Sequence, residues 1–239
     1  MARILYDLCG ADQRLRFSPF CWRAHMALRH KGLDYEARPW LFTDKDEIAF
    51  SVEGDGSKAT VPVLVDDDDR VINDSFEILR YLDHAYPDTP LLDQDRAESR
   101  ARFIKYWSET QVAPAIFRII ILDIFRNLDE RDQPYFRESR EQRFGVTLEE
   151  FHNPDQGREM LDRALTPLRS HLQELPFLDG QTAGGADYIA FGIFMTARVM
   201  RGEPLLSGED VVGQWQDRLL DEFHGFARSA TTVRELQAN

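Results

Sequence analysis

A serine and a cysteine stand close together at the expected start of a helix, in the segment Ser18-Pro19-Phe20-Cys21. Proline is favoured in the first turn of a helix, and serine is favoured directly before it because its side chain caps free backbone N–H groups. A hydroxyl at this position also lies at the positive end of the helix macrodipole, where it can hydrogen-bond to an anion such as a thiolate. Ser18 is therefore a candidate for anion stabilisation as well as a plain N-cap, and Cys21 is a candidate for thiol chemistry.

Two later segments of the sequence could bind a peptide-like ligand. The dipeptide Val61-Pro62 opens a β-branched run, and the backbone of Val61 could pair with an extended peptide; the alternative is an ordinary edge-strand proline. Asp74 and Ser75 open a second expected helix, where N–H groups and a serine hydroxyl suit a carboxylate and an aspartate suits an amine. Asp74 with Glu77 is also an ordinary capping arrangement, and one aspartate can serve in both roles.

The elements expected around these residues form a βαβ unit followed by a ββα unit. Apolar periodicity, turn residues and prolines set their bounds. The expected strands cover residues 3–8, 35–39, 61–65 and 71–72, and the expected helices cover residues 19–31 and 74–86. This order predicts an α/β domain over residues 1–86.

After a linker at residues 87–95 that contains two prolines, the pattern is helical. The clearest stripe places leucines at 3.6-residue spacing from Leu161 to Leu175. Helices are expected at residues 97–112, 115–128, 160–175, 186–200 and 211–228. A charged segment at about 129–158 interrupts them, and we expect an insertion that is too polar to join the core. Residues 96–239 therefore predict an all-helical second domain.

The composition is that of a globular protein with an acidic surface. The 239 residues carry a formal net charge of -13 without a compensating basic cluster, which disfavours nucleic acid and anionic membranes as partners. No apolar run approaches the about 20 residues that span a bilayer, and residues 1–8 do not resemble a signal peptide. Two cysteines are too few for a disulfide scaffold, and no metal-binding spacing is present. We expect a cytoplasmic protein without a metal.

Three motifs in this order resemble the glutathione S-transferase superfamily. Ser-Pro-Phe-Cys (18–21) is similar to the Cys-Pro-x-Cys of glutaredoxins with serine in place of the leading cysteine, as in serine-type transferases. Val61-Pro62 resembles the superfamily's cis-proline step, and residues 74–78 resemble its Glu/Asp-Ser-x-x-Ile motif. The resemblance covers nearly the whole chain. It implies an N-terminal thioredoxin-like α/β domain plus an all-α C-terminal domain, the glutathione S-transferase fold.

Within the superfamily the chain most resembles the bacterial lignin β-aryl-etherases and related fungal glutathione transferases. Residues 17–23, 30–33 and 140–150 carry this resemblance. It implies glutathione as co-substrate, a thiolate that attacks an apolar, aromatic electrophile, and cleavage of a β-aryl ether as the narrower activity. By analogy it also implies a homodimer.

The resemblance implies which residues form the site. Those expected to bind glutathione are Ser18, Thr60, Val61, Pro62, Asp74 and Ser75. A free thiol has a pKa near 8.5, so Ser18 would have to favour the thiolate at neutral pH. The candidates for the electrophile pocket are Phe20, Phe103, Trp107, Phe117 and Ile121, each of which could instead be plain helix core.

Two residues offer alternatives to Ser18. Tyr6 stands near the end of the first strand, where tyrosine-type transferases place their activating residue, although a strand-borne aromatic is more often core. Cys21 would serve a glutaredoxin-like thiol transferase, although a thiol inside a helix usually behaves as a small hydrophobe. A third alternative is a transferase-like protein that binds partners without catalysis.

Overall fold

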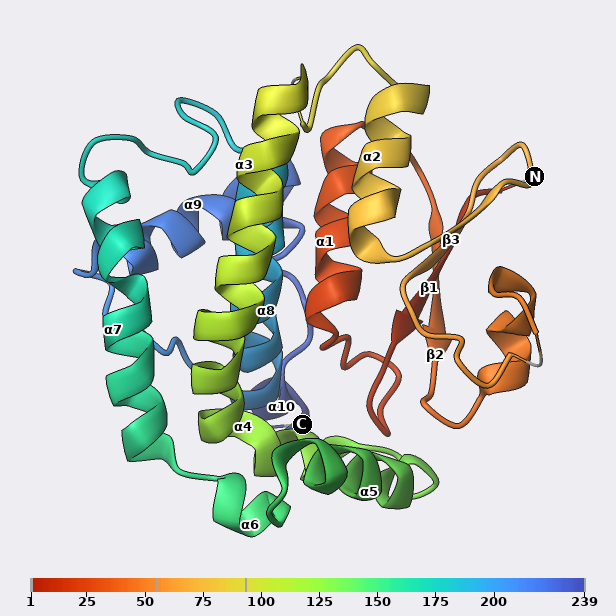
Figure 1. The fold of residues 1–239 in the computed structure, drawn as a ribbon, viewed down its shortest axis with the longest axis vertical. Coiled ribbons are helices and arrows are strands. Elements are labelled where there is room, and N and C mark those ends of the chain that lie inside the picture. The colour runs from red at the N-terminus through yellow and green to blue at the C-terminus, as the bar shows by residue number, and fades with distance from the viewer. Residues whose placement is uncertain (1, 55, 93, 239) are drawn as a thin grey trace.

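The computed structural model describes residues 2–54, 56–92 and 94–238. Within these residues a sheet domain, at the right of Figure 1, packs against a larger helical domain at the left. The predicted combination of a thioredoxin-like α/β domain with a helical domain is confirmed. No helix in the described ranges is long and apolar enough to cross a membrane.

The sheet domain holds four strands in the order β2-β1-β3-β4. The strands are β1 (Ile4–Leu8), β2 (Glu36–Trp40), β3 (Val63–Val65) and β4 (Val71–Asn73). β1 and β2 are parallel, and β3 is antiparallel to both β1 and β4. Helices α1 (Pro19–His30) and α2 (Ser75–Ala85) complete the domain, with a short 3-10 helix, η1 (Lys45–Ser51), between β2 and β3.

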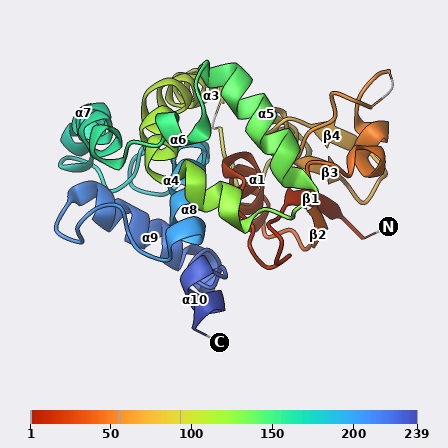
Figure 2. The same ribbon diagram turned by 90° about the horizontal axis from the view of Figure 1, so that it is seen from below.

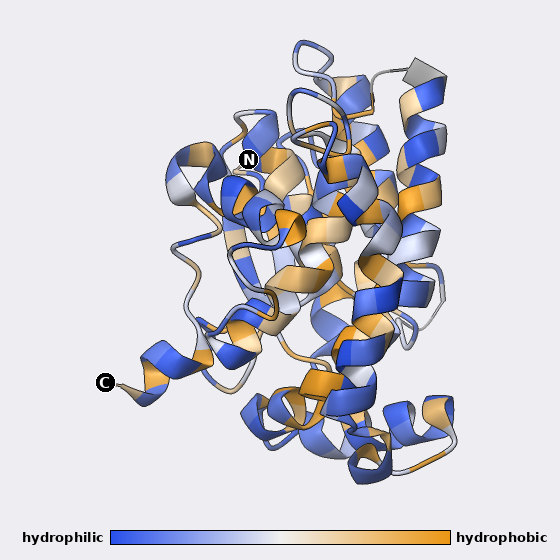
Figure 3. Cartoon of the chain, turned by 90° about the vertical axis from the view of Figure 1, so that its left-hand side faces the viewer, coloured by the Kyte–Doolittle hydropathy of each residue, from blue (hydrophilic) through white to orange (hydrophobic). Residues whose placement is uncertain are grey.

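The helical domain follows from residue 94 onward. Its elements are α3 (Gln94–Trp107), a π-helical turn η2 (Ser108–Val112), α4 (Ala113–Asn127), α5 (Asp132–Phe144), α6 (Leu148–Phe151), α7 (Pro154–Leu172), α8 (Gly185–Arg201), α9 (Val211–Gly225) and α10 (Val233–Gln237). Apolar and polar residues are interspersed along most of these helices, as Figure 3 shows, which is the pattern of helices that bury one face, whereas α8 is buried over nearly its whole length.

Helix α1 lies between the sheet and α8, and its packing joins the two domains. A Cβ atom on Gly192 of α8 would lie 2.2 Å from the carbonyl oxygen of Pro19, so only glycine permits this approach. The fully buried Arg23 of α1 donates hydrogen bonds to the Ile189 carbonyl at 3.1 Å and to Glu109 at 2.7 Å. The start of α1 is thereby fixed against the helical domain.

The charged segment at 129–158 contradicts the expectation that it is too polar to join the core. It forms α5, α6 and the first residues of α7, and Phe136, Leu148 and Phe151 are buried. Figure 2 shows α5 extending from the helical domain to the sheet. The segment therefore bridges the two domains.

Side-chain spacing along α5 explains how so polar a helix is partly buried. Asp132, Phe136, Arg140 and Phe144 recur every four residues and thus share one face. Charged side chains elsewhere on α5 form ion pairs, such as Arg137 with Glu141 of the same helix at 2.8 Å and with Glu149 of α6 at 2.9 Å. The average composition of the segment does not reveal that one face of α5 is buried while its other residues form surface ion pairs.

Candidate active site

A cavity of about 540 Å³ lies between the two domains. The sheet domain lines it with the start of α1 and the segment before β3, represented by Ser18 and Val61. The helical domain lines it with α4, α5 and α6, and Thr196 of α8 also reaches it. Most of the lining side chains are aliphatic or aromatic, so the cavity suits an apolar ligand held by a few polar groups.

Ser18 lies at the N-terminus of α1, on the wall of the cavity. Its side-chain oxygen accepts a hydrogen bond from the backbone N–H of Cys21 at 3.3 Å, so the expected N-cap is present. The residue is only 3% exposed, which keeps its hydroxyl out of bulk water. A partly desolvated hydroxyl at the positive end of a helix is suited to stabilise an anion in the cavity.

Cys21 lies inside α1 and is fully buried. Burial raises the pKa of its thiol well above the usual range, and the nearby Asp7 adds to this, while the Ser18 hydroxyl acts in the opposite direction. The thiol therefore stays protonated at neutral pH, and Cys21 does not line the cavity. These features fit packing beneath the site better than thiol chemistry.

Tyr6 faces a different part of the sheet domain. Its hydroxyl accepts a hydrogen bond from Arg38 at 3.1 Å, and its ring packs edge-on against Phe50. Tyr6 is not part of the cavity lining, so its hydroxyl is not placed beside Ser18.

The other residues expected to bind glutathione lie in the segment before β3 and at the start of α2. Thr60 and Val61 line the cavity, and the Val61-Pro62 peptide bond is cis. Because Val63 pairs with Asn73 in the antiparallel ladder, continuing that register sets Asp74 and Ser75 opposite the Val61-Pro62 step. Pro62, Asp74 and Ser75 do not themselves line the cavity, but they lie at the same end of the β3–β4 pair.

Asp74 and Ser75 differ in how their polar atoms are satisfied. Asp74 is the N-cap of α2 and accepts hydrogen bonds from the backbone N–H groups of Phe76 at 2.8 Å and Glu77 at 3.2 Å. The Ser75 hydroxyl is buried and has no hydrogen-bond partner among the described residues. A buried hydroxyl without a partner is costly, which makes Ser75 the stronger candidate to contact a ligand.

The sequence matches two family profiles. Residues 17–85 match the glutathione S-transferase N-terminal domain, and residues 100–226 match the glutathione S-transferase C-terminal domain. The chain belongs to the glutathione S-transferase family. The predicted family and fold are thereby confirmed.

Relatives and solved structures show the same similarity. Glutathione S-transferase Z1 of Arabidopsis thaliana is 38% identical over 109 residues, which are 46% of this chain and 48% of the relative. The chain thus matches about half the length of such curated relatives. The crystal structure of glutathione transferase GSTFuA3 from Phanerochaete chrysosporium superposes with a TM-score of 0.81 at 26% identity, covering 92% of this chain and 96% of that one.

A second fungal structure has a similar fold. The glutathione S-transferase CsGST63524 of Ceriporiopsis subvermispora, solved in complex with glutathione, superposes with a TM-score of 0.78 at 21% identity. This superposition covers 98% of this chain and 99% of that one.

The residues expected to form the electrophile pocket of this glutathione S-transferase are only partly brought together in the cavity. Phe20, Phe117 and Ile121 line the cavity, whereas Phe103 and Trp107 do not. Phe103 is 68% exposed to solvent, and Trp107 is packed against the core. The physical reason is that both precede the π-helical turn of η2, and the helix reaches the cavity only at Glu109, within that turn.

Several aromatic side chains of the cavity were missed in the sequence. They are Phe42 after β2, Tyr135, Phe136 and Phe144 on α5, and Phe151 on α6. The stacked rings of Phe144 and Phe151, with centroids 3.8 Å apart, hold α5 against α6. The four-residue spacing from Asp132 to Phe144 was the available signal, and the segment's charge obscured it.

The cavity also carries cations that the sequence analysis missed. Lys45 donates a hydrogen bond to the carbonyl oxygen of Ala59 at 2.7 Å and lies over the rings of Trp40 and Tyr135. Burial lowers the pKa of Lys45, and the neighbouring Arg140 lowers it further. Lys45 is therefore close to the Thr60-Val61 step and suited to hold a carboxylate there.

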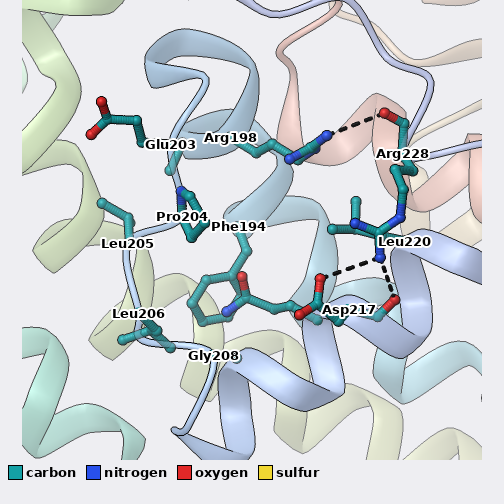
Figure 4. A pocket seen from close by; sticks show the side chains of 13 residues that line it. Phe194, Arg198, Glu203, Pro204, Leu205, Leu206, Gly208, Asp217, Leu220 and Arg228 are labelled. Atoms are coloured by element: carbon teal, nitrogen blue, oxygen red, sulfur yellow. Dashed lines mark hydrogen bonds and ion pairs between the residues drawn. The ribbon is translucent and has the colours of Figure 1, made fainter.

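A smaller cavity of about 120 Å³ lies between the C-terminal end of α8, the loop after it and α9. Figure 4 shows Leu205 and Leu206 on one side of it and Arg198 and Arg228 on the other. The Arg198 side chain donates a hydrogen bond to the Arg228 carbonyl oxygen at 3.1 Å. None of the residues expected to bind glutathione lines this cavity, so the larger one is the candidate active site.

Proposed function

We propose that this protein is a serine-type glutathione transferase in which Ser18 stabilises the glutathione thiolate. The observation that carries the proposal is the position of the Ser18 hydroxyl, at the N-terminus of α1 and on the wall of an apolar cavity. A hydrogen bond from this hydroxyl and the helix macrodipole each favour the anion by on the order of 1 kcal/mol. Together they would increase the thiolate fraction at neutral pH.

The tripeptide would lie across one end of the sheet, from Ser75 after β4 to Lys45 after β2. The free hydroxyl of Ser75, at the start of α2, suits the γ-glutamyl carboxylate, and Asp74 suits the amine. The backbone of Val61 would pair with the cysteinyl unit as an added strand does. Lys45 beyond Thr60 suits the glycyl carboxylate.

The reaction would be displacement at carbon. The thiolate sulfur attacks the electrophilic carbon, a C–S bond forms, and the leaving group departs with the electron pair of the broken bond. For a β-aryl ether, the broken bond is C–O and the leaving group is a phenolate, which takes a proton from water. The aromatic lining supports this narrower activity because it suits both rings of such a substrate.

The direct test compares two substitutions in a conjugation assay with glutathione and chlorodinitrobenzene. We expect Ser18→Ala to lower kcat/KM at least about tenfold, because the lost hydrogen bond acts on the reacting sulfur. Cys21→Ala changes a residue beneath the same helix turn and should leave kcat/KM within about twofold. If Cys21→Ala abolishes turnover and Ser18→Ala does not, the protein is a thiol transferase. If neither matters and glutathione does not bind, the enzyme hypothesis fails.

The homodimer implied by family analogy is also a proposal. One chain has a mass of 27.7 kDa. Sedimentation at micromolar concentration should give twice this mass, and a monomeric mass would contradict the proposal.

A further inference from the structure

Two arginines of α5 stand at the cavity wall without a carboxylate partner. Arg140 and Arg143 both line the cavity, and neither forms an ion pair with an acidic group of the described residues. The polar contact found for Arg140 is a hydrogen bond to the hydroxyl of its neighbour Ser139 at 3.0 Å. Burial lowers the pKa of Arg140, the charge on Arg143 lowers it further, and Tyr135 opposes the change. Arg140 is thus partly desolvated, and a second positive charge, on the exposed Arg143, lies near it.

The charge around the cavity differs from that of the whole chain. The formal net charge is -13, yet the charged side chains lining the cavity are Lys45, Arg140, Arg143 and Glu109. Glu109 is already paired with Arg23 at 2.7 Å and with Lys105 at 3.2 Å. The unpaired charge at the wall is thus positive, in a protein whose surface is otherwise acidic.

Aromatic rings hold Arg140 in place. Its guanidinium lies over the rings of Phe42 at 5.5 Å and Phe136 at 4.8 Å. A guanidinium stacked on rings keeps its N–H groups free at the edge of its plane, where they can bind a carboxylate in a bidentate manner. The aromatic rings beside it would contact an aromatic body attached to that carboxylate.

Arg140 neighbours Lys45, but neither Arg140 nor Arg143 is among the groups assigned to glutathione. Lys45 reaches the segment before Val61 through Ala59, whereas Arg140 and Arg143 belong to the last turns of α5. The two carboxylates of glutathione already have candidate partners in Ser75 and Lys45. An anion that pairs with Arg140 and Arg143 would therefore have to come from the second substrate.

Resting on the proposed transferase function, we propose that the electrophile is an aromatic compound with an acidic group, which Arg140 and Arg143 bind while the thiolate attacks. The ring would lie among the cavity phenylalanines, and the carboxylate would reach the two guanidinium groups. Arg140 and Arg143 are then specificity-determining residues.

The experiment uses one electrophile in two charge states, chlorodinitrobenzoate and its methyl ester. Wild type should prefer the acid in kcat/KM. Arg140→Gln should lower kcat/KM for the acid about tenfold or more, because a charge-assisted hydrogen bond is lost, and should leave the ester and the KM for glutathione within about twofold. Arg163→Gln is the matched control: it removes the same charge from an exposed site on α7, outside the cavity, and should change neither substrate.

The remaining outcomes separate the possible errors. If Arg140→Gln raises the KM for glutathione instead, the arginine binds the glycyl carboxylate and the inference is overturned. Equal losses for acid and ester overturn it as well, because a charge-specific contact cannot act on both. If wild type turns over the ester and does not prefer the acid, this inference is rejected, but the proposed transferase function is not. Absence of turnover for both compounds, with no glutathione binding, rejects the transferase function itself.

Discussion

Asp132, the first residue of α5, accepts hydrogen bonds from both the backbone N–H and the hydroxyl of Thr43, at 2.9 and 2.8 Å. The same carboxylate accepts the backbone N–H of Phe42 at 2.8 Å, and it is fully buried. These contacts fasten α5 to the segment that follows β2. Because Phe136, Arg140 and Phe144 share a face of α5 with Asp132, this one carboxylate helps to set the wall of the cavity.

We therefore expect Asp132→Ala to affect both stability and activity. The substitution removes the acceptor of two partly buried backbone N–H groups, those of Phe42 and Thr43, which should lower the free energy of unfolding by about 3 kcal/mol. It should also lower kcat/KM for an aromatic electrophile several-fold, because α5 is no longer held at its N-terminal end. Urea unfolding and a conjugation assay measure the two effects.

The control for Asp132 is Asp155→Ala on α7. The Asp155 side chain is 96% exposed, so its loss should change the free energy of unfolding by no more than about 0.5 kcal/mol. Equal effects of the two substitutions would show that the contact to Thr43 does not position α5.

The two phenylalanines Phe117 and Phe103 test which face of the helical domain binds the electrophile. Phe117 lines the cavity, and Phe103 is mostly exposed outside it. Phe117→Ala should raise the KM for an apolar aromatic electrophile about tenfold, since contact area with the ligand is lost. Phe103→Ala removes the same side chain and should leave that KM unchanged. A larger effect from Phe103 would place the pocket on the other side of α3.

The carboxylate of Asp66 should link stability to pH. It is buried and accepts hydrogen bonds from Arg3 at 2.5 Å, Tyr81 at 2.6 Å and Tyr86 at 2.8 Å. Burial alone would raise the pKa of Asp66, but these hydrogen bonds outweigh it and hold the pKa below its usual range. Since the folded pKa lies below the unfolded value of about 3.9, the stabilisation is complete above that value and is lost as the pH falls through the folded pKa.

Asp66→Asn should accordingly lower the free energy of unfolding at pH 7 by about 3 kcal/mol, because it breaks a buried ion pair. The difference from wild type should shrink below about pH 4, where Asp66 of the unfolded chain takes up a proton, and should reach its minimum below the folded pKa. Chemical unfolding across this pH range measures it. A difference that grows in acid would contradict the assignment. The KM for glutathione at pH 7 should not change, because Asp66 does not line the cavity.

The motifs at helix starts were readable in the sequence because their chemistry is local. Ser18 and Asp74 cap the helices that directly follow them, and the residue type at the cap reveals the position. The same local pattern could not place Phe103, since which face of a long helix meets the other domain depends on packing. The π-helical turn at Ser108–Val112 shifts which side chains face the sheet domain, and its residue types do not predict a π-helical turn.

The segment at 129–158 was misjudged for a different reason. Its average polarity is high, but burial depends on which residues share a face. Asp132, Phe136 and Arg140 are buried or half-buried together because a partner element, the segment after β2, supplies donors and rings for them. A tertiary partner of this kind is not encoded in the segment itself.

The role of Ser18 is tested most sharply by the pKa of the glutathione thiol when it is bound to the protein. Titration of the thiolate absorbance in the complex measures it, with wild type and Ser18→Ala compared at saturating glutathione. A free thiol has a pKa near 8.5, and binding beside Ser18 should lower it, whereas Ser18→Ala should raise the bound value by about one unit through loss of the hydrogen bond. If the bound thiol titrates identically in both proteins, Ser18 does not activate glutathione, and the account given for this site is wrong.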